Sequence, residues 1–369
     1  MKIGILTLPL HTNYGGILQA YALQTVLERM GHEVYLIDRQ KYPIHLPLWK
    51  APLSYSKRIL KNIIGKPCTI FYERQYNIEY PIESQNTDIF INKYIRFIKA
   101  KHLKDLQSVR LDAIVVGSDQ VWRPVYDKHI ENAYLKFASN WDIKRVAYAA
   151  SFGTDEWEYS KSQTLICKNL IRQFDAVSVR EQSGIDMCRR YFDVEAEHVL
   201  DPTFLLNEED YIHLFKDSKV PQNRGNLLCY ILDNSLEKEA LITKIAKEKQ
   251  LIPFIVNSNV EDKSLKLESR IQPSVEQWLR GFYDAEFVVT DSFHGCVFSI
   301  IFNKPFIVFG NYKRGLSRFT SLLGMFGLEN RFITQKTDMT NEIEWERVKS
   351  VLRKRKSQSE SFLKQSLDF

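Results

Sequence analysis

Short apolar segments alternate with helical segments along almost the whole chain, and this alternation restricts the possible folds most strongly. Residues Lys2 to Leu8 are nearly all apolar, which is typical of a strand buried on both faces of a parallel sheet. Apolar residues then recur at helical spacing from Gly15 to Gly31, and Glu33 to Asp38 has the pattern of a second strand. This strand, helix and strand form a βαβ unit, so we predict a parallel, Rossmann-like sheet.

The same alternation continues through the second half of the chain. Further predicted strands cover residues 113–117, 145–150, 176–179, 198–200, 227–232, 252–256, 287–290 and 306–309. The 369 residues exceed the usual size of a single core, and Asp201 and Pro202 begin a polar stretch typical of a domain boundary. We therefore predict an α/β fold with two Rossmann-like domains, residues 1–205 and 206–340, that face a cleft. A charged helix at 341–369 should pack back across both domains.

The segment from Tyr42 to Tyr94 departs from this pattern and is predicted to be an insertion in the first domain. Prolines interrupt its aromatic and basic stretches. A short helix with two different faces is predicted within it. The apolar face carries Tyr55, Ile59, Leu60 and Ile63, and the basic face carries Lys57, Arg58 and Lys61. Two interpretations are open: a helix packed on the sheet, which we prefer, or peripheral contact with the inner membrane surface.

Composition and motif searches narrow the possible partners. The formal net charge of +6 comes from scattered lysines and arginines, without the basic, aromatic-rich face expected for a nucleic-acid partner. Gly-x-Gly, P-loop and metal-ligand spacings are missing from the sequence, so we predict no metal and no bound cofactor. No apolar run is long enough to cross a bilayer, and the five scattered cysteines indicate reduced thiols, so we expect a cytoplasmic protein.

Polar loops follow several of the predicted strands, at the edge where parallel sheets bind ligands. The candidate ligand-binding residues in these loops are Asn13, Tyr14, Gly15, Gly16, Ser118, Asp119, Gln120, Arg180, Ser292, His294, Gly295, Lys313, Arg314 and Arg318. The glycines would let backbone N–H groups approach an anionic ligand at a helix N-terminus. His294 would lie in the first turn of such a helix.

Purely structural interpretations compete with these assignments. Asn13 can be an ordinary helix cap, and Asp119 can be a capping aspartate. Arg180 can form an exposed ion pair with Glu181, and the cations around Arg318 can be solvated charges. A single loop does not decide between these interpretations, but the order of the loops along the chain is much less common by chance.

The sequence blocks that carry these loops give the clearest indication of function. They are Asn-Tyr-Gly-Gly before a Leu-Gln-Ala-Tyr-Ala-Leu helix, Val-Gly-Ser-Asp-Gln-Val-Trp, Tyr-Ala-Ala-Ser-Phe-Gly, Ser-Val-Arg-Glu, Leu-Asp-Pro-Thr and Asp-Ser-Phe-His-Gly. From Asn13 to about Arg318, the chain thus resembles the polysaccharide pyruvyl transferase family. The resemblance implies a GT-B-like fold, phosphoenolpyruvate as donor, and a sugar or lipid-linked saccharide as acceptor.

The resemblance also implies roles for single residues. His294 and Arg180 would serve the donor from opposite domains, and Asp119 is a candidate for activating the acceptor. We hypothesise a cyclic pyruvate ketal formed on a sugar during synthesis of exopolysaccharide, capsule or cell-wall glycan. His294→Ala and Arg180→Ala should abolish phosphate release with little change in Tm. Two alternatives are open: a GT-B glycosyltransferase with a nucleotide-sugar donor, and a non-catalytic carbohydrate-binding protein.

Overall fold

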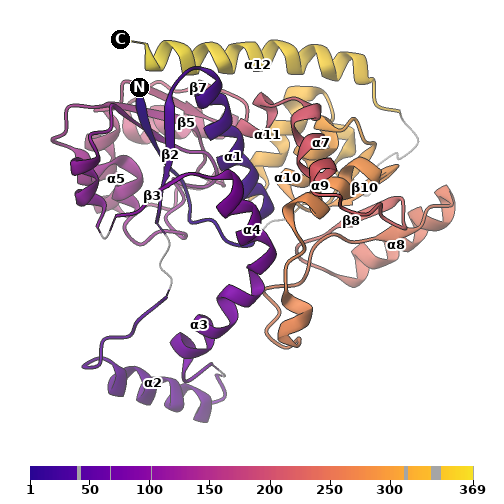
Figure 1. Ribbon diagram of the computed structural model, residues 1–369, viewed down its shortest axis with the longest axis horizontal. Helices are drawn as coiled ribbons and strands as arrows, with labels where there is room; N and C mark the ends of the chain where they lie inside the picture. The colour runs from indigo at the N-terminus through magenta and orange to yellow at the C-terminus, as the bar shows by residue number, and fades with distance from the viewer. Residues whose placement is uncertain (40–42, 67, 101, 311–314, 334–341, 369) are drawn as a thin grey trace.

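Two parallel sheets organise the chain (Figure 1). The structure is a computed structural model that describes residues 1–39, 43–66, 68–100, 102–310, 315–333 and 342–368. Within these residues one sheet has seven strands in the order β3-β2-β1-β4-β5-β6-β7, and the other has four in the order β11-β10-β8-β9. Every pair of neighbouring strands is parallel, which confirms the predicted α/β class.

The first sheet contains the predicted strands and one that the sequence pattern does not reveal. Its strands are β1 (Lys2–Leu6), β2 (Glu33–Ile37), β3 (Phe97–Ile98), β4 (Ala113–Val116), β5 (Lys144–Ala150), β6 (Ala176–Val179) and β7 (Glu197–His198). All four residues of β4 are buried, as its unbroken apolar sequence predicts. The unforeseen strand is β3, which extends the sheet by pairing Phe97 with Leu36.

The second sheet is smaller, and helices cover both sheets. Its strands are β8 (Leu227–Tyr230), β9 (Pro253–Phe254), β10 (Phe287–Thr290) and β11 (Phe306–Val308). The helices around the two sheets are α1 (Tyr14–Arg29), α5 (Lys161–Ile171), α6 (Gln182–Met187), α7 (Glu208–Asp217), α8 (Leu236–Lys249), α9 (Val275–Asp284), α10 (Phe293–Ile301) and α11 (Ser317–Phe326). One buried cluster includes Ile5 of β1, Leu18 of α1, Phe298 of α10 and Val288 of β10, so the sheets share a continuous core.

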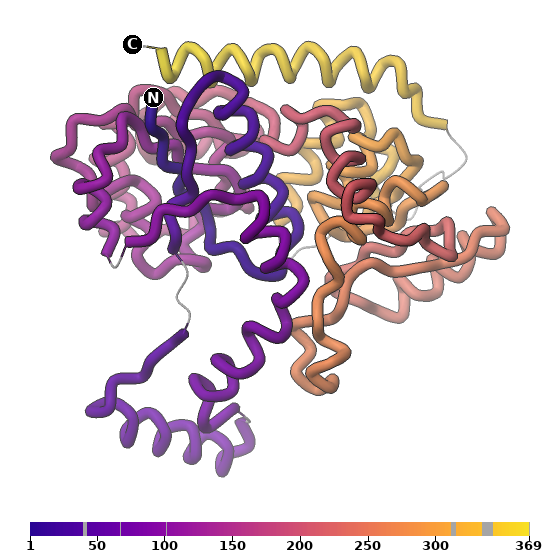
Figure 2. The backbone as a smooth tube through the Cα atoms, viewed as in Figure 1, coloured from indigo at the N-terminus to yellow at the C-terminus, as the bar shows by residue number. Residues whose placement is uncertain are grey.

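The last helix, α12 (Trp345–Leu367), lies along the top of the molecule in Figure 2. Its Phe362 ring lies 6.2 Å from the ring of Tyr148 in β5, and the helix also contacts α11. Although the sequence looks too polar for a core helix, one side is buried through Val348, Leu363 and Leu367. The helix therefore bridges elements of both sheets.

The insertion folds as three helices, α2 (Ala51–Ile63), α3 (Tyr72–Glu83) and α4 (Gln85–Tyr94). In Figure 1, α2 and α3 project away from both sheets. No residue of α2 is buried, so our preferred interpretation of this helix as one packed on the sheet is wrong. None of the described helices combines the length and the apolar character that a membrane crossing requires.

Candidate functional site

Charged side chains from the carboxyl ends of three strands meet at Asp201. Arg180, which follows β6, donates from Nη1 to Oδ2 of Asp201 at 2.7 Å and from Nη2 to Oδ1 of Asp119 at 3.0 Å. Asp119 follows β4, and Asp201 follows β7. This meeting of loops is expected because parallel strands end at one edge of a sheet. We use the name Asp201 cluster for Asp119, Arg180, Glu181, Asp201, His294 and Arg318.

The second sheet contributes His294 to this cluster. The residue lies in the first turn of α10, and its Nε2 is 3.7 Å from the same Oδ2 of Asp201 that Arg180 contacts. The ring packs directly on Gly15 at the start of α1, where an added Cβ would lie 1.9 Å from Nδ1. His294 and Arg180 thus converge from opposite sheets on one carboxylate.

Two guanidinium groups lie near the ring that precedes His294. The Cζ atom of Arg180 is 4.7 Å from the centre of the Phe293 ring, and that of Arg318 in α11 is 5.5 Å away. Both arginines are almost completely buried. Cation–π attraction to the ring and the nearby carboxylates offset part of the cost of burying these charges. The idea that Arg318 is a solvated surface cation is therefore wrong.

Opposing effects set the protonation of the two aspartates. Burial alone would raise the pKa of Asp119, but the positive charges of Arg180, His294 and Arg318 outweigh it and lower the pKa. For Asp201, burial is likewise outweighed, here by His294 and Arg180 together with the hydrogen bond from Thr203, and its pKa lies well below the usual range. Both carboxylates are held in the ionised form.

Burial sets the direction of the pKa shift for two other members, Glu181 and Arg318. Burial raises the pKa of Glu181 although Arg180 and Arg318 oppose this shift. Its Oε1 accepts hydrogen bonds from the backbone N–H groups of Phe152 and Gly153, and its side chain is fully buried. The interpretation of Arg180 and Glu181 as an exposed ion pair is thus wrong. Burial, reinforced by the charge of Arg180, lowers the pKa of Arg318 to about 10.

Comparison with known proteins assigns the family. The sequence profile described as polysaccharide pyruvyl transferase matches residues 13–313, more than half of the chain. The chain belongs to this family. The match contains the Asp201 cluster except Arg318, and it supports pyruvyl transfer in polysaccharide synthesis in general terms. A search of the curated proteins finds no match.

Two solved structures resemble this family member distantly. The UDP-GlcNAc 2-epimerase from Neisseria meningitidis is 10% identical with a TM-score of 0.49, covering 100% of this chain and 95% of the epimerase. Acinetobacter baumannii MurG is 9% identical with a TM-score of 0.42, covering 98% and 95%. Such likenesses are too weak to assign a ligand or an activity.

The predicted loop at the start of α1 has mainly structural contacts. Asn13 caps the helix, because its Oδ1 accepts from the backbone N of Gly16 at 3.2 Å. The hydroxyl of Tyr14 donates to the carbonyl oxygens of Pro273 and Val256 in the second half of the chain. Burial raises the pKa of this hydroxyl well above its ordinary value. These contacts join the start of α1 to the second half of the chain.

The loop after β4 is fixed from several sides. Ser118 donates from Oγ to the carbonyl of Ala149 and lies 3.3 Å from Oδ2 of Asp201. Its backbone N donates to Oε1 of Gln19, a buried α1 residue that our sequence analysis did not single out. Gln120 lies against Gly153, where an added Cβ would approach Oε1 to 1.9 Å. These contacts hold Asp119 in place.

The structure describes only some of the remaining predicted site residues. Ser292 precedes α10, and Gly295 in that helix packs so tightly on Thr290 that an added Cβ would lie 2.2 Å from Oγ1. Lys313 and Arg314 lie outside the described residues. Asp201 is the central residue that our sequence analysis missed as a site residue. Its block, Leu-Asp-Pro-Thr, was the available signal, but we interpreted the proline only as a domain boundary.

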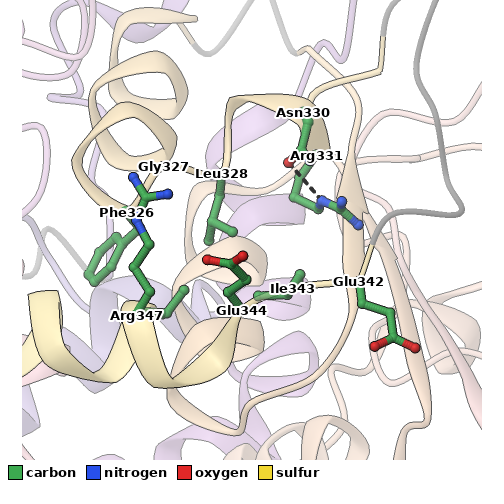
Figure 3. Close-up of a pocket in the computed structure, with 10 residues that line it drawn as sticks. Phe326, Gly327, Leu328, Asn330, Arg331, Glu342, Ile343, Glu344 and Arg347 are labelled. Atoms are coloured by element: carbon green, nitrogen blue, oxygen red, sulfur yellow. Dashed lines mark hydrogen bonds between the residues drawn. The ribbon is translucent and has the colours of Figure 1, made fainter.

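Two cavities occur elsewhere, and neither includes the Asp201 cluster. One, of about 320 Å³, lies between the end of α11 and the start of α12, where Arg331, Glu344 and Arg347 line it (Figure 3). The other, of about 580 Å³, is lined by residues of α3 and of its connection to α2. Across the part of the chain that the structure describes, no group of three or more His, Cys, Asp or Glu side chains is arranged to hold a metal.

Proposed function

We propose that this family member transfers pyruvate from phosphoenolpyruvate to two hydroxyls of one sugar. A proton adds to the methylene carbon of the donor, and one hydroxyl oxygen bonds to the enol carbon. The bond from that carbon to the phosphate oxygen breaks and phosphate leaves with the remaining proton, while the second hydroxyl oxygen closes the cyclic ketal. The two hydroxyl protons thus balance the new methyl group and the released hydrogen phosphate.

The observation that carries this proposal is the convergence of Arg180 and His294 on Asp201 within the residues that match the family. Phosphoenolpyruvate presents a carboxylate and a phosphate close together, so its site needs at least two cations. Arg180 and Arg318, which both lie close to the Phe293 ring, are our candidates. Lys313 and Arg314 are further candidates from the sequence. Donor anions would compete with Asp119 and Asp201 for the Arg180 guanidinium.

We assign proton transfer to His294, either to the donor methylene or to the leaving phosphate. Its Nε2 lies 3.7 Å from Oδ2 of Asp201, whose carboxylate orients the ring, so Asp201 is a positioning residue. Asp119 is our candidate for the acceptor hydroxyl. Because its pKa is lowered, it is a weak base, and we propose that it orients the hydroxyl before accepting its proton. The acceptor would be a lipid-linked precursor of exopolysaccharide, capsule or cell-wall glycan, modified in the cytoplasm.

The test is turnover with phosphoenolpyruvate and candidate lipid-linked saccharides. The amount of phosphate released should equal the amount of product formed. Mass spectrometry should show that the product has gained the mass of one pyruvic acid less one water. His294→Gln keeps a polar side chain but removes the proton donor, so its rate should fall about 100-fold to 10,000-fold with little change in Tm. Unchanged activity of that variant would remove His294 from the mechanism.

Controls separate the two alternative functions. Uridine and guanosine diphosphates should not raise Tm, whereas phosphoenolpyruvate should. Protection by a nucleoside diphosphate alone would favour a nucleotide-sugar donor. Saccharide binding that persists without turnover of any donor would favour a non-catalytic carbohydrate-binding protein.

A further inference from the structure

We propose that α2 is a docking surface for membranes that contain anionic lipids. None of the residues of α2 is buried. In Figure 1 the helix lies at the lower left, beyond α3 and clear of both sheets. The docking proposal does not depend on the reaction proposed above.

The apolar side of α2 points to solvent. Large apolar side chains on this side and on the residues flanking the helix are strongly exposed, namely Leu48 90%, Trp49 77%, Leu53 64%, Ile59 45%, Leu60 58%, Ile63 75% and Ile64 59%. So many exposed large apolar side chains in one short segment are uncommon on a protein that stays alone in water and mark an interaction site. A helix that covers no core while exposing such a face is typical of one lying in a membrane interface.

Specific contacts hold α2 in this orientation. Arg58 forms a two-bond ion pair with Glu73 of α3, with distances of 2.6 and 2.7 Å, and it also donates to the carbonyl of Ile70. The Tyr55 ring lies 5.2 Å from the ring of Phe71. At 3.6 residues per turn, Tyr55 and Arg58 lie on the opposite side of α2 from Leu53, Leu60 and Ile64. Tyr55, which we predicted to be part of the apolar face, therefore packs on Phe71 and is not part of the exposed apolar side. The exposure of the apolar side is therefore built into the packing between α2 and α3.

The charge around this apolar side identifies the partner. Between residues 43 and 72 the sequence contains five Lys or Arg residues and no Asp or Glu. Arg58 is neutralised by Glu73, which leaves Lys50, Lys57, Lys61 and Lys66, all exposed. A second copy of the same positive surface would be repelled, whereas anionic lipid headgroups would be attracted.

The remaining features of the segment agree with a lipid interface. Trp49, with Lys50 Nζ 4.6 Å from its ring centre, combines an aromatic ring and a cation, as residues at membrane surfaces often do. The connection between α2 and α3 lines the cavity of about 580 Å³, whose walls include Ile70, Phe71, Ile78 and Leu267. Further apolar side chains thus lie on the α3 side of α2.

The proposal is tested by flotation of the full chain with vesicles, without any substrate. The protein should float with phosphatidylcholine vesicles that contain phosphatidylglycerol and not with phosphatidylcholine alone, and salt should reduce binding. Lys57→Gln and Lys61→Gln should each weaken binding about fivefold. Leu60→Glu with Ile63→Glu should abolish it without lowering Tm, because both side chains are already exposed.

Matched controls lie on α8, where Leu236 is 84% exposed and Lys247 is also exposed. Leu236→Glu and Lys247→Gln should leave flotation unchanged. Failure to float with anionic vesicles would overturn the proposal, as would equal flotation of the α2 and α8 variants. A dimer in sedimentation that Leu60→Glu with Ile63→Glu abolishes, without any vesicle binding, would instead identify a second copy as the partner.

Discussion

At the scale of single residues, one buried carboxylate joins both halves of the site. Asp201 accepts from Arg180 and from Thr203, lies near Ser118, and faces His294 from the second sheet. A buried charge with several partners is costly to disturb, because each partner loses its compensation when one is removed. The expectation that Arg180→Ala leaves Tm nearly unchanged therefore does not fit the structure.

Arg180→Ala should instead lower the free energy of unfolding by about 3–5 kcal/mol, because it removes the one guanidinium that pairs with both buried carboxylates, Asp119 and Asp201. Urea unfolding of the variant and the wild type at pH 7 measures this change. Arg180→Lys keeps the charge but not the two-pronged geometry, so it should be less destabilised than Arg180→Ala. Equal stability of Arg180→Ala and wild type would contradict the buried network.

Acid titration provides a second measurement of the same network. The folded-state pKa values of Asp119 and Asp201 are lowered from the model-compound value of 3.8. Their ion pairs therefore stabilise the fold above that pH, and this contribution is lost as the pH falls below it. As the pH falls, the free energy of unfolding should decrease more steeply in wild type than in Arg180→Ala. If the free energy of unfolding changed in parallel with pH in the two proteins, these ion pairs would contribute nothing to stability.

At the scale of helices and strands, much of the fold could be predicted because buried parallel strands are unbroken apolar runs bounded by turns. The predicted ends of β6 and β10 agree with the structure, whereas β3 has only two residues and no pattern of its own. The orientation of α2 was not predictable, since periodicity defines a face but not what covers it. The approach of Asp201 to His294 depends on contacts between sheets, which one sequence does not encode locally.

Two adjacent glycines at the start of α1 allow a paired experiment. A Cβ on Gly15 would lie 1.9 Å from Nδ1 of His294, whereas a Cβ on Gly16 would meet its nearest atom at 3.6 Å, an ordinary contact. Gly15→Ala should displace the imidazole and reduce turnover by about 100-fold, the lower end of the range for losing a general acid. Gly16→Ala should retain turnover. Equal rates for the two variants would indicate that the ring position is unimportant.

Substitutions of Asn13, which caps α1, distinguish a structural role of this residue from a ligand-binding role. Its Oδ1 accepts from Gly16 N, so Asn13→Ala should cost about 1 kcal/mol of unfolding free energy, and Asn13→Asp should restore most of it. Thermal unfolding together with KM for phosphoenolpyruvate measures both effects. A capping role predicts a changed Tm and an unchanged KM. An increased KM in both variants would favour the predicted ligand contact.

At the scale of the whole molecule, α3 connects the proposed membrane face to the site loops. At its far end His11 stacks on Tyr80 with ring centres 3.7 Å apart, and Arg270 from the second half of the chain pairs with Glu79 and Glu83. Arg270 and Glu83 are almost fully buried. This end of α3 therefore links the insertion to the loop that precedes α1.

If both proposals hold, docking through α2 should favour acceptors embedded in anionic vesicles over the same saccharide freed from its lipid. The Lys57→Gln Lys61→Gln variant should lower the ratio of vesicle turnover to free-saccharide turnover by about 25-fold, because each lysine contributes about fivefold to surface binding. Phosphate release measured with both acceptors gives this ratio. The ratio should return toward one at high salt, where headgroup attraction is screened. A ratio that the variant leaves unchanged would separate membrane docking from catalysis.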